Sequence, residues 1–90
     1  MKVYIVIEQW GSPYEPPRYS SHDVYGVYST FEKACKKFQE ICNESFNWIK
    51  DATSVNETDD WDDYIIENNY AYMCVNEHWC EIFIDEFELQ

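Results

Sequence analysis

The sequence predicts a small α+β domain in which one amphipathic helix packs on an antiparallel sheet of about four strands, in the order ββαββ. Two patterns indicate this. Segments with alternating apolar residues lie near both ends of the chain, and a segment with apolar steps of three and four lies between them. Of the 90 residues, 46% are hydrophobic and 19% aromatic, which is enough apolar surface for one core. Residues 1–90 are therefore expected to form a single domain.

The first two strands are predicted at residues 2–10 and 23–28. The first segment is rich in β-branched residues, which favour strands. Its alternation gives two faces, with Val3, Ile5 and Ile7 on one and Tyr4, Val6 and Glu8 on the other. Residues 11–22 contain the run Gly-Ser-Pro-Tyr-Glu-Pro-Pro, which is typical of a loop. We expect the two strands to be antiparallel neighbours.

A helix is predicted at about residues 30–50. Ser29 and Glu32 have the spacing of a capping box, in which each side chain bonds the backbone N–H of the other residue. The apolar stripe that follows consists of Phe31, Ala34, Cys35, Phe38, Ile41, Cys42, Ser45, Trp48 and Ile49. Lysines and glutamates fall on the opposite side, so the stripe should pack across the sheet.

The last part of the chain predicts a hairpin, with strands at residues 70–75 and 79–89 and a turn at 76–78. In its second strand Cys80, Ile82 and Ile84 share one face, and Trp79, Phe83 and Phe87 share the other. Apolar residues on both faces are typical of an interior strand. Residues 51–69 leave helix, strand and loop open; one interpretation has the aspartates capping a short helical turn before Tyr64.

Acidic residues set residues 51–90 apart from the rest. Residues 1–50 contain all six Lys and Arg residues and six acids, whereas residues 51–90 contain twelve acids and neither Lys nor Arg. The net charge of −12 therefore arises entirely in the second half. Charge of this kind keeps a small protein soluble, and it also attracts basic partners.

The acids of the last strand should form rows, because alternate residues of a strand lie about 6.5–7 Å apart on one face. Phosphates along a nucleic-acid strand have a comparable spacing, so such a surface can compete for the Lys and Arg residues of a nucleic-acid groove. The aromatic residues Trp61, Tyr64, Tyr70 and Tyr72 lie among the acids as candidate anchors. The candidate partner-binding residues are Asp59, Asp60, Trp61, Asp62, Asp63, Glu67, Glu77, Glu81, Asp85, Glu86 and Glu88.

No motif indicates catalysis, a cofactor or a metal, so we expect a protein that is not an enzyme. Two glycines cannot supply a glycine-rich phosphate loop. The four cysteines include no C-x-x-C pair and are expected to be buried free thiols. Residues 59–63 lack the Gly and the final Glu of an EF-hand loop, which favours a solvated acidic loop. His22 and His78 are expected to be exposed, in a loop and in a turn.

Four pieces of the chain resemble a group of small acidic proteins of phages and bacteria. These are Val3-Tyr4-Ile5-Val6-Ile7-Glu8, Gly26-Val27-Tyr28-Ser29 and the helix start Glu32-Lys33-Ala34, together with the short acidic last strand. The resemblance implies a mobile-element origin and a compact α+β fold. It carries over no functional residue.

Charge and resemblance together predict an inhibitor that occupies a basic nucleic-acid-binding surface, a DNA mimic of the anti-CRISPR kind. Its partner would be a basic protein such as a nuclease or a CRISPR effector, in the host cytoplasm. We expect neither direct nucleic-acid binding nor a membrane span, since Glu8 interrupts the first apolar segment. The alternatives are a homodimer or accessory interaction module without mimicry, and a small ligand-binding or metal-binding protein.

Overall fold

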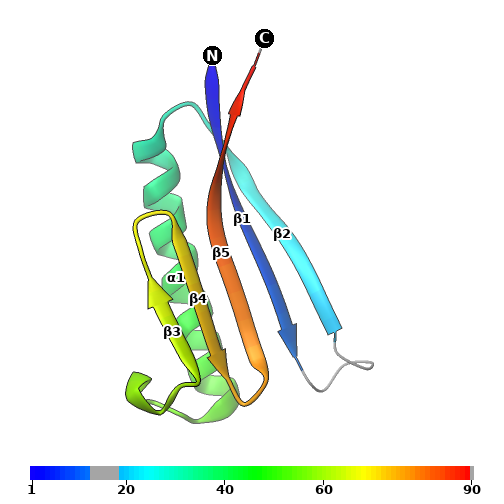
Figure 1. Cartoon of the computed structure of the whole chain (residues 1–90), viewed down its shortest axis with the longest axis vertical. Helices are drawn as coiled ribbons and strands as arrows, with labels where there is room; N and C mark the ends of the chain where they lie inside the picture. The colour runs from blue at the N-terminus through cyan, green and yellow to red at the C-terminus, as the bar shows by residue number, and fades with distance from the viewer. Residues whose placement is uncertain (13–18, 90) are drawn as a thin grey trace.

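A five-stranded antiparallel sheet with one long helix across one of its faces makes up the described part of the chain (Figure 1). The computed structural model describes residues 1–12 and 19–89. The sheet order is β2-β1-β5-β4-β3, so the last strand of the chain lies at the centre of the sheet. The α+β class is confirmed. The number of strands is not, because the described elements follow the order ββαβββ and give five strands rather than four.

β1 (Lys2–Ser12) and β2 (Tyr19–Tyr28) are antiparallel neighbours, as predicted. Both run further than the sequence indicated, so the ends of the loop predicted at residues 11–22 belong to strands. The rest of that loop lies outside the described residues. The register shifts between Ile5 and Ile7, opposite Gly26, whose φ of 123° favours glycine. The structure therefore places a β-bulge in the middle of this pair.

α1 (Phe31–Thr53) agrees with the predicted helix except at its cap. The N-cap is Thr30, whose backbone is extended (φ −133°, ψ 149°) and whose hydroxyl accepts a hydrogen bond from the Lys33 N–H at 3.2 Å. The capping box predicted at Ser29 is therefore wrong by one residue. The two neighbouring residues are both good caps, and sequence alone does not separate them.

The core lies between α1 and the face of the sheet that it covers. Its buried side chains are Ala34, Phe38, Ile41, Cys42 and Ile49 from the helix and Val6, Ala71, Met73, Val75, Cys80 and Ile82 from the sheet, with Trp61 at one end. Each large apolar side chain buried in this way contributes about 1.5–3 kcal/mol to folding. The helical stripe predicted from the sequence is therefore confirmed at these five helix residues, whereas its members Phe31 and Trp48 remain 40% and 45% exposed.

The segment that the sequence left open contains a short 3₁₀ turn, η1 (Thr58–Asp60), and the edge strand β3 (Asp63–Ile66). β3 pairs with β4 (Tyr70–Val75). All four residues of β3 are exposed. A strand this short, without a buried face, shows no clear alternation, and the fifth strand was missed for that reason.

β4 and β5 (His78–Glu88) form the predicted C-terminal hairpin. Its turn uses Asn76 and Glu77, which both have positive φ (51° and 70°), the pattern of a type I′ turn. β5 lies between β1 and β4, which confirms the predicted interior strand. His78 is the first residue of β5 and only 4% exposed, so the prediction of an exposed turn histidine is wrong.

Candidate functional site

One face of the sheet is covered by α1, and the other, which we call the open face, carries no helix in the described residues. Its apolar members are Val3, Ile5, Ile7, Val24, Val27, Ile65, Tyr70, Tyr72, Trp79, Phe83 and Phe87. The strands pair in register, so these side chains are neighbours across the sheet. Val24 is 63% exposed and Phe87 47% exposed. An apolar surface of this kind is a candidate for contact with another molecule.

Carboxylates lie among the apolar side chains of the open face. Asp63, Glu81 and Asp85 occupy open-face positions of β3 and β5. The described lysines do not, because four of them lie on α1 and Lys2 lies on the covered side of β1, in the same alternation as Val6. The Tyr70 hydroxyl donates a hydrogen bond to Glu81 Oε2 at 2.7 Å, which is the main reason why the Tyr70 pKa rises to about 12. In the described residues the charge of the open face is therefore negative.

A second group of the predicted acids lies at the end of the sheet where the chain turns from β4 into β5 (Figure 1). Asp59 and Asp60 belong to η1 and are exposed. Asp62 follows and is tied to the turn, since its Oδ2 accepts a hydrogen bond from the Asn76 N–H at 3.1 Å. Glu77 is the next residue of that turn. This acidic end continues the negative charge of the open face.

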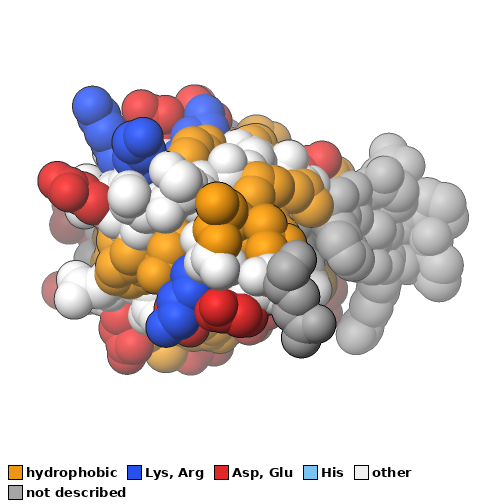
Figure 2. Space-filling view, turned by 90° about the horizontal axis from the view of Figure 1, so that it is seen from above, with side chains coloured by type: hydrophobic (Ala, Val, Ile, Leu, Met, Phe, Trp, Pro, Cys, Tyr) orange, Lys and Arg blue, Asp and Glu red, His pale blue; other side chains and the backbone are white. Residues whose placement is uncertain are grey.

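A third group lies apart from the other two. Glu86 and Glu88 alternate with Asp85 along β5 and so take the opposite side of the strand. Glu86 lies 3.8 Å from Lys2 Nζ, and Glu88 lies 3.3 Å from the N-terminal amino group. Figure 2, which is seen from the end that carries both termini, shows acids and lysines close together there, with hydrophobic patches between them. The acids of β5 thus form two separate sets.

Two further members of the predicted set have local roles. Trp61 is 7% exposed, stacks on Phe46 with ring centroids 5.0 Å apart, and donates its Nε1–H to the Val55 carbonyl at 3.1 Å. Its indole is therefore part of the core and is not accessible to a partner. Glu67 lies in the exposed turn between β3 and β4, where its backbone N–H donates to the Tyr70 carbonyl at 2.8 Å.

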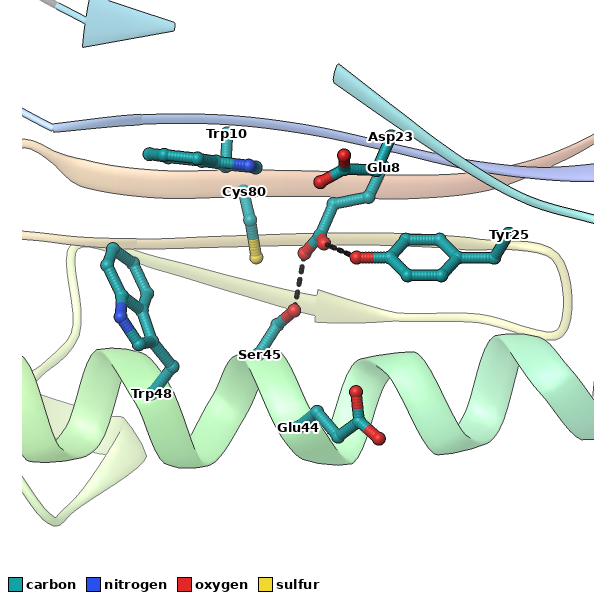
Figure 3. Close-up of a pocket in the computed structure, with 8 residues that line it drawn as sticks. All are labelled: Glu8, Trp10, Asp23, Tyr25, Glu44, Ser45, Trp48 and Cys80. Carbon is teal, nitrogen blue, oxygen red and sulfur yellow. Dashed lines mark hydrogen bonds between the residues drawn. The ribbon is translucent and has the colours of Figure 1, made fainter. Parts of the chain in front are cut away.

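A pocket of about 250 Å³ lies on the covered side of the sheet (Figure 3). At its inner end is Glu8 of β1, a residue that is only 6% exposed. Glu8 accepts hydrogen bonds from the Tyr25 hydroxyl of β2, at 2.9 Å, and from the Ser45 hydroxyl of α1. The thiol of Cys80, from β5, lines the same pocket. Three strands and the helix therefore contribute to one site.

The outer part of the pocket is both aromatic and acidic. Trp10 and Trp48 line one side, with ring centroids 6.0 Å apart. Asp23 and Glu44 add two carboxylates. Burial is the main reason why the Glu8 pKa rises; the hydrogen bonds from Ser45 and Tyr25 oppose the rise, and the charges of Asp23 and Glu44 add to it.

No motif in the sequence indicates this pocket, although two weaker signals are present. Glu8 interrupts the apolar alternation of β1, and Ser45 interrupts the apolar stripe of α1. Each is a polar residue at a position that should face the core. Two such residues on facing elements indicate a buried hydrogen bond, because buried polar groups need partners. Only the strand order shows that they meet.

The described residues offer little for covalent chemistry. All four cysteines are free, but only Cys42 and Cys80 are buried, so the prediction of buried thiols is wrong for Cys35 and Cys74, which are partly exposed. Burial raises the pKa of each thiol, that of Cys42 to about 12. No group of three His, Cys, Asp or Glu side chains in this part of the chain is placed to hold a metal ion. No helix of the described structure is both long and apolar enough to span a bilayer. Comparison with protein-family models, curated proteins and solved structures finds no match to this chain.

Proposed function

We propose that this protein is a non-catalytic binding protein that docks onto a basic surface of another protein. The observation that carries the proposal is the open face, an uncovered apolar surface whose described charges are all carboxylates. Apolar side chains supply contact area, and the acids select a partner rich in Lys and Arg. The acidic end around η1 extends the same charge.

The size of the surface is adequate for a specific complex. The two longer axes of the molecule measure 44 and 28 Å, and the view down the shortest axis faces the sheet (Figure 1). A specific interface buries about 800 Å² on each partner, so the open face has room for one. Tyr70 and Tyr72 remain candidate anchors, and Trp79 takes the place of Trp61, because aromatic residues dominate binding energies at interface centres.

The partner that fits this chemistry best is a nucleic-acid-binding protein in the cytoplasm. Its Lys and Arg side chains bind phosphates, and Asp59, Asp60, Glu81 and Asp85 offer carboxylates in their place. Occupation of that surface would inhibit nucleic-acid binding, as a DNA mimic encoded by a phage or other mobile element would do. A nuclease or CRISPR effector is the kind of target we propose.

The test is competition in a salt series. Bacterial nucleic-acid-binding proteins captured by the purified chain are assayed for DNA or RNA binding with and without it. We expect the chain to displace nucleic acid from its partner, with affinity that falls as salt rises. A double variant, Glu81→Gln with Asp85→Asn, should weaken binding by about tenfold, or 1.4 kcal/mol.

The matched control is Glu86→Gln with Glu88→Gln, which removes the same charge from the other side of the same strand. We expect its affinity to stay within about twofold of wild type, a difference of less than 0.5 kcal/mol. Equal weakening by both double variants would mean that net charge, not the open face, drives binding. Captured proteins that keep their nucleic acid would overturn the inhibitor proposal.

The apolar character of the open face also supports a second candidate, a homodimer formed face to face. Two copies would bring Glu81 and Asp85 close to their own counterparts, and high salt would then strengthen the dimer. Sedimentation at low and high salt separates the candidates. A dimer that tightens with salt and dissociates in a Phe83→Ala variant would favour an interaction module whose acids only confer solubility.

A further inference from the structure

The pocket of Figure 3 has a chemistry that the proposed function does not use. It lies on the opposite side of the sheet from the open face, so its role can be tested separately. Its volume of about 250 Å³ is below the range of about 300–1,000 Å³ that drug-sized ligands occupy. It therefore suits a small molecule or a single side chain of a larger one.

Two indoles form one side of the pocket. The planes of Trp10 and Trp48 are inclined by 59°, with centroids 6.0 Å apart. Trp48 remains 45% exposed although it belongs to the packing stripe of α1. The face of an indole attracts cations through its quadrupole, and sites for alkylammonium ions are commonly built from several aromatic rings.

Carboxylates form the rest of the site. Glu8 is more than nine-tenths buried, and the partners that its two oxygens bond, Tyr25 and Ser45, are neutral hydroxyls. Asp23 and Glu44 add negative charge, and no Lys or Arg is among the described residues that line the pocket. A buried carboxylate usually has a positive partner, because desolvation destabilises an isolated charge. The pocket thus provides negative charge that a ligand can balance.

We propose that this pocket binds an aliphatic ammonium ion, which is a primary or methylated amine. The amine has the pair of indoles on one side and the Glu8 carboxylate on the other. The alkyl part contacts the aromatic rings, and the charged nitrogen faces the acids. Anions are repelled by the same acids, and neutral molecules gain nothing from them. A bare metal ion fits less well, because the described acids are not grouped as metal ligands. The amine is either a free small molecule or a Lys side chain of another protein.

The first experiment titrates the ¹⁵N-labelled full chain with butylammonium and with tetramethylammonium, and follows the indole N–H signals. We expect saturable shifts of the Trp10 and Trp48 signals, with a dissociation constant on the order of 1–10 mM. Butanol and butyrate serve as neutral and anionic controls and should bind at least about tenfold more weakly. Equal binding of butanol, or a calcium ion that produces the same shifts more strongly, would overturn the proposal.

Variants then test the site itself. Trp48→Ala removes a half-exposed ring and should weaken butylammonium binding by at least about tenfold, and Glu44→Gln by about threefold. Asp51→Asn makes the same charge change on the same helix but outside the pocket, and should bind within about twofold of wild type. Amide spectra check that each variant is folded. If Asp51→Asn weakened binding as much as Glu44→Gln, only diffuse charge would attract the amine and the site would be excluded.

A last arm separates the two sources of the amine. Nα-acetyl-lysine amide carries the same ammonium group on a peptide backbone. If it binds as well as butylammonium, the pocket accepts a Lys side chain of a partner. If only butylammonium binds, the backbone does not fit and the ligand is a free amine. If neither butylammonium nor Nα-acetyl-lysine amide binds, the proposal of an amine site is overturned. The proposal for the open face does not depend on this result.

Discussion

The two faces of the sheet are both largely apolar, but the protein covers only one of them. Val6, Met73 and Ile82 on the covered face are completely buried. On the open face Phe83, the residue next to Ile82, is only partly buried, and Val24 is 63% exposed. Because side chains alternate along a strand, neighbouring residues of one sequence meet two environments. The covered face forms the core of the fold, and the open face carries no helix in the described residues.

The carboxylates of the two faces also have different surroundings. The interior carboxylate of the covered side, Glu8, has its oxygens bonded to two hydroxyl groups. The open face has Glu81 bonded to Tyr70, with Asp85 and Asp63 beside it. Composition assigns the excess acid to one half of the chain, whereas strand alternation divides it between surfaces. A charge total therefore does not define a binding surface until the strand pairing is known.

The largest expected effect comes from truncation on the covered face. Ile82→Ala removes a fully buried side chain and should lower the free energy of unfolding by about 2–5 kcal/mol. Phe83→Ala, one residue along the strand, should cost only about 1–2 kcal/mol, because its ring lies on the open face. Urea unfolding of the two variants checks the comparison. Equal losses would show that the open face is covered in solution, as it would be in a dimer.

A smaller effect is expected from crowding on the open face. A Cβ at Gly11 would overlap Nε1 of Trp79, its cross-strand partner, so the indole must move. Gly11→Ala should therefore cost about 1–3 kcal/mol and expose Trp79. A double-mutant cycle with Trp79→Ala measures the coupling. If the Gly11→Ala loss persists without the indole, backbone effects and not this contact are responsible.

Much of the fold was predictable from local patterns. The stripe from Phe38 to Ile49, the two faces of β5 and the C-terminal hairpin all follow from periodicity, and the structure confirms them. β3 was not predictable, since a four-residue exposed strand has no periodic signal and depends on pairing with β4. The cap is one residue later than predicted, because the spacing of Ser29 and Glu32 favours Ser29 whereas Thr30, itself a good cap residue, is the one that bonds the Lys33 N–H.

The candidate sites were predictable only in part. Strand alternation alone separates Glu86 from Asp85, but the sequence could not show which of the two faces the helix covers, nor that Trp61 turns into the core. The pocket requires β1, β2, β5 and α1 to meet, which no local pattern encodes. The polar interruptions at Glu8 and Ser45 were the one local sign of it.

A more moderate effect on stability is expected from the titration of Glu8, the buried carboxylate of the covered side. Burial raises the folded-state pKa of Glu8 above its ordinary value, so the folded protein holds this proton more tightly than the unfolded chain. The stabilisation of the folded state by this proton is complete at low pH and is lost as pH rises through the raised pKa. The Gln side chain of Glu8→Gln does not titrate. As pH rises above about 4.5, the free energy of unfolding of this variant should therefore fall less than that of wild type. Thermal unfolding at several pH values, with Asp51→Asn as a charge control, measures the difference; identical slopes for Glu8→Gln and wild type would contradict it.

The smallest effect is expected for the acids at the end that carries the termini. Glu86→Gln removes an ion pair with Lys2 whose side chains are more than half exposed, so it should change stability by less than about 0.5 kcal/mol. Glu81→Gln should also cost little, since Gln can still accept from the Tyr70 hydroxyl. It should nevertheless lower the Tyr70 pKa from about 12, because the neighbouring charge is lost, and an NMR titration reports this. The two substitutions on one strand would then have equally small effects on stability but different effects on partner binding. This is the result expected if the open face serves recognition and not folding.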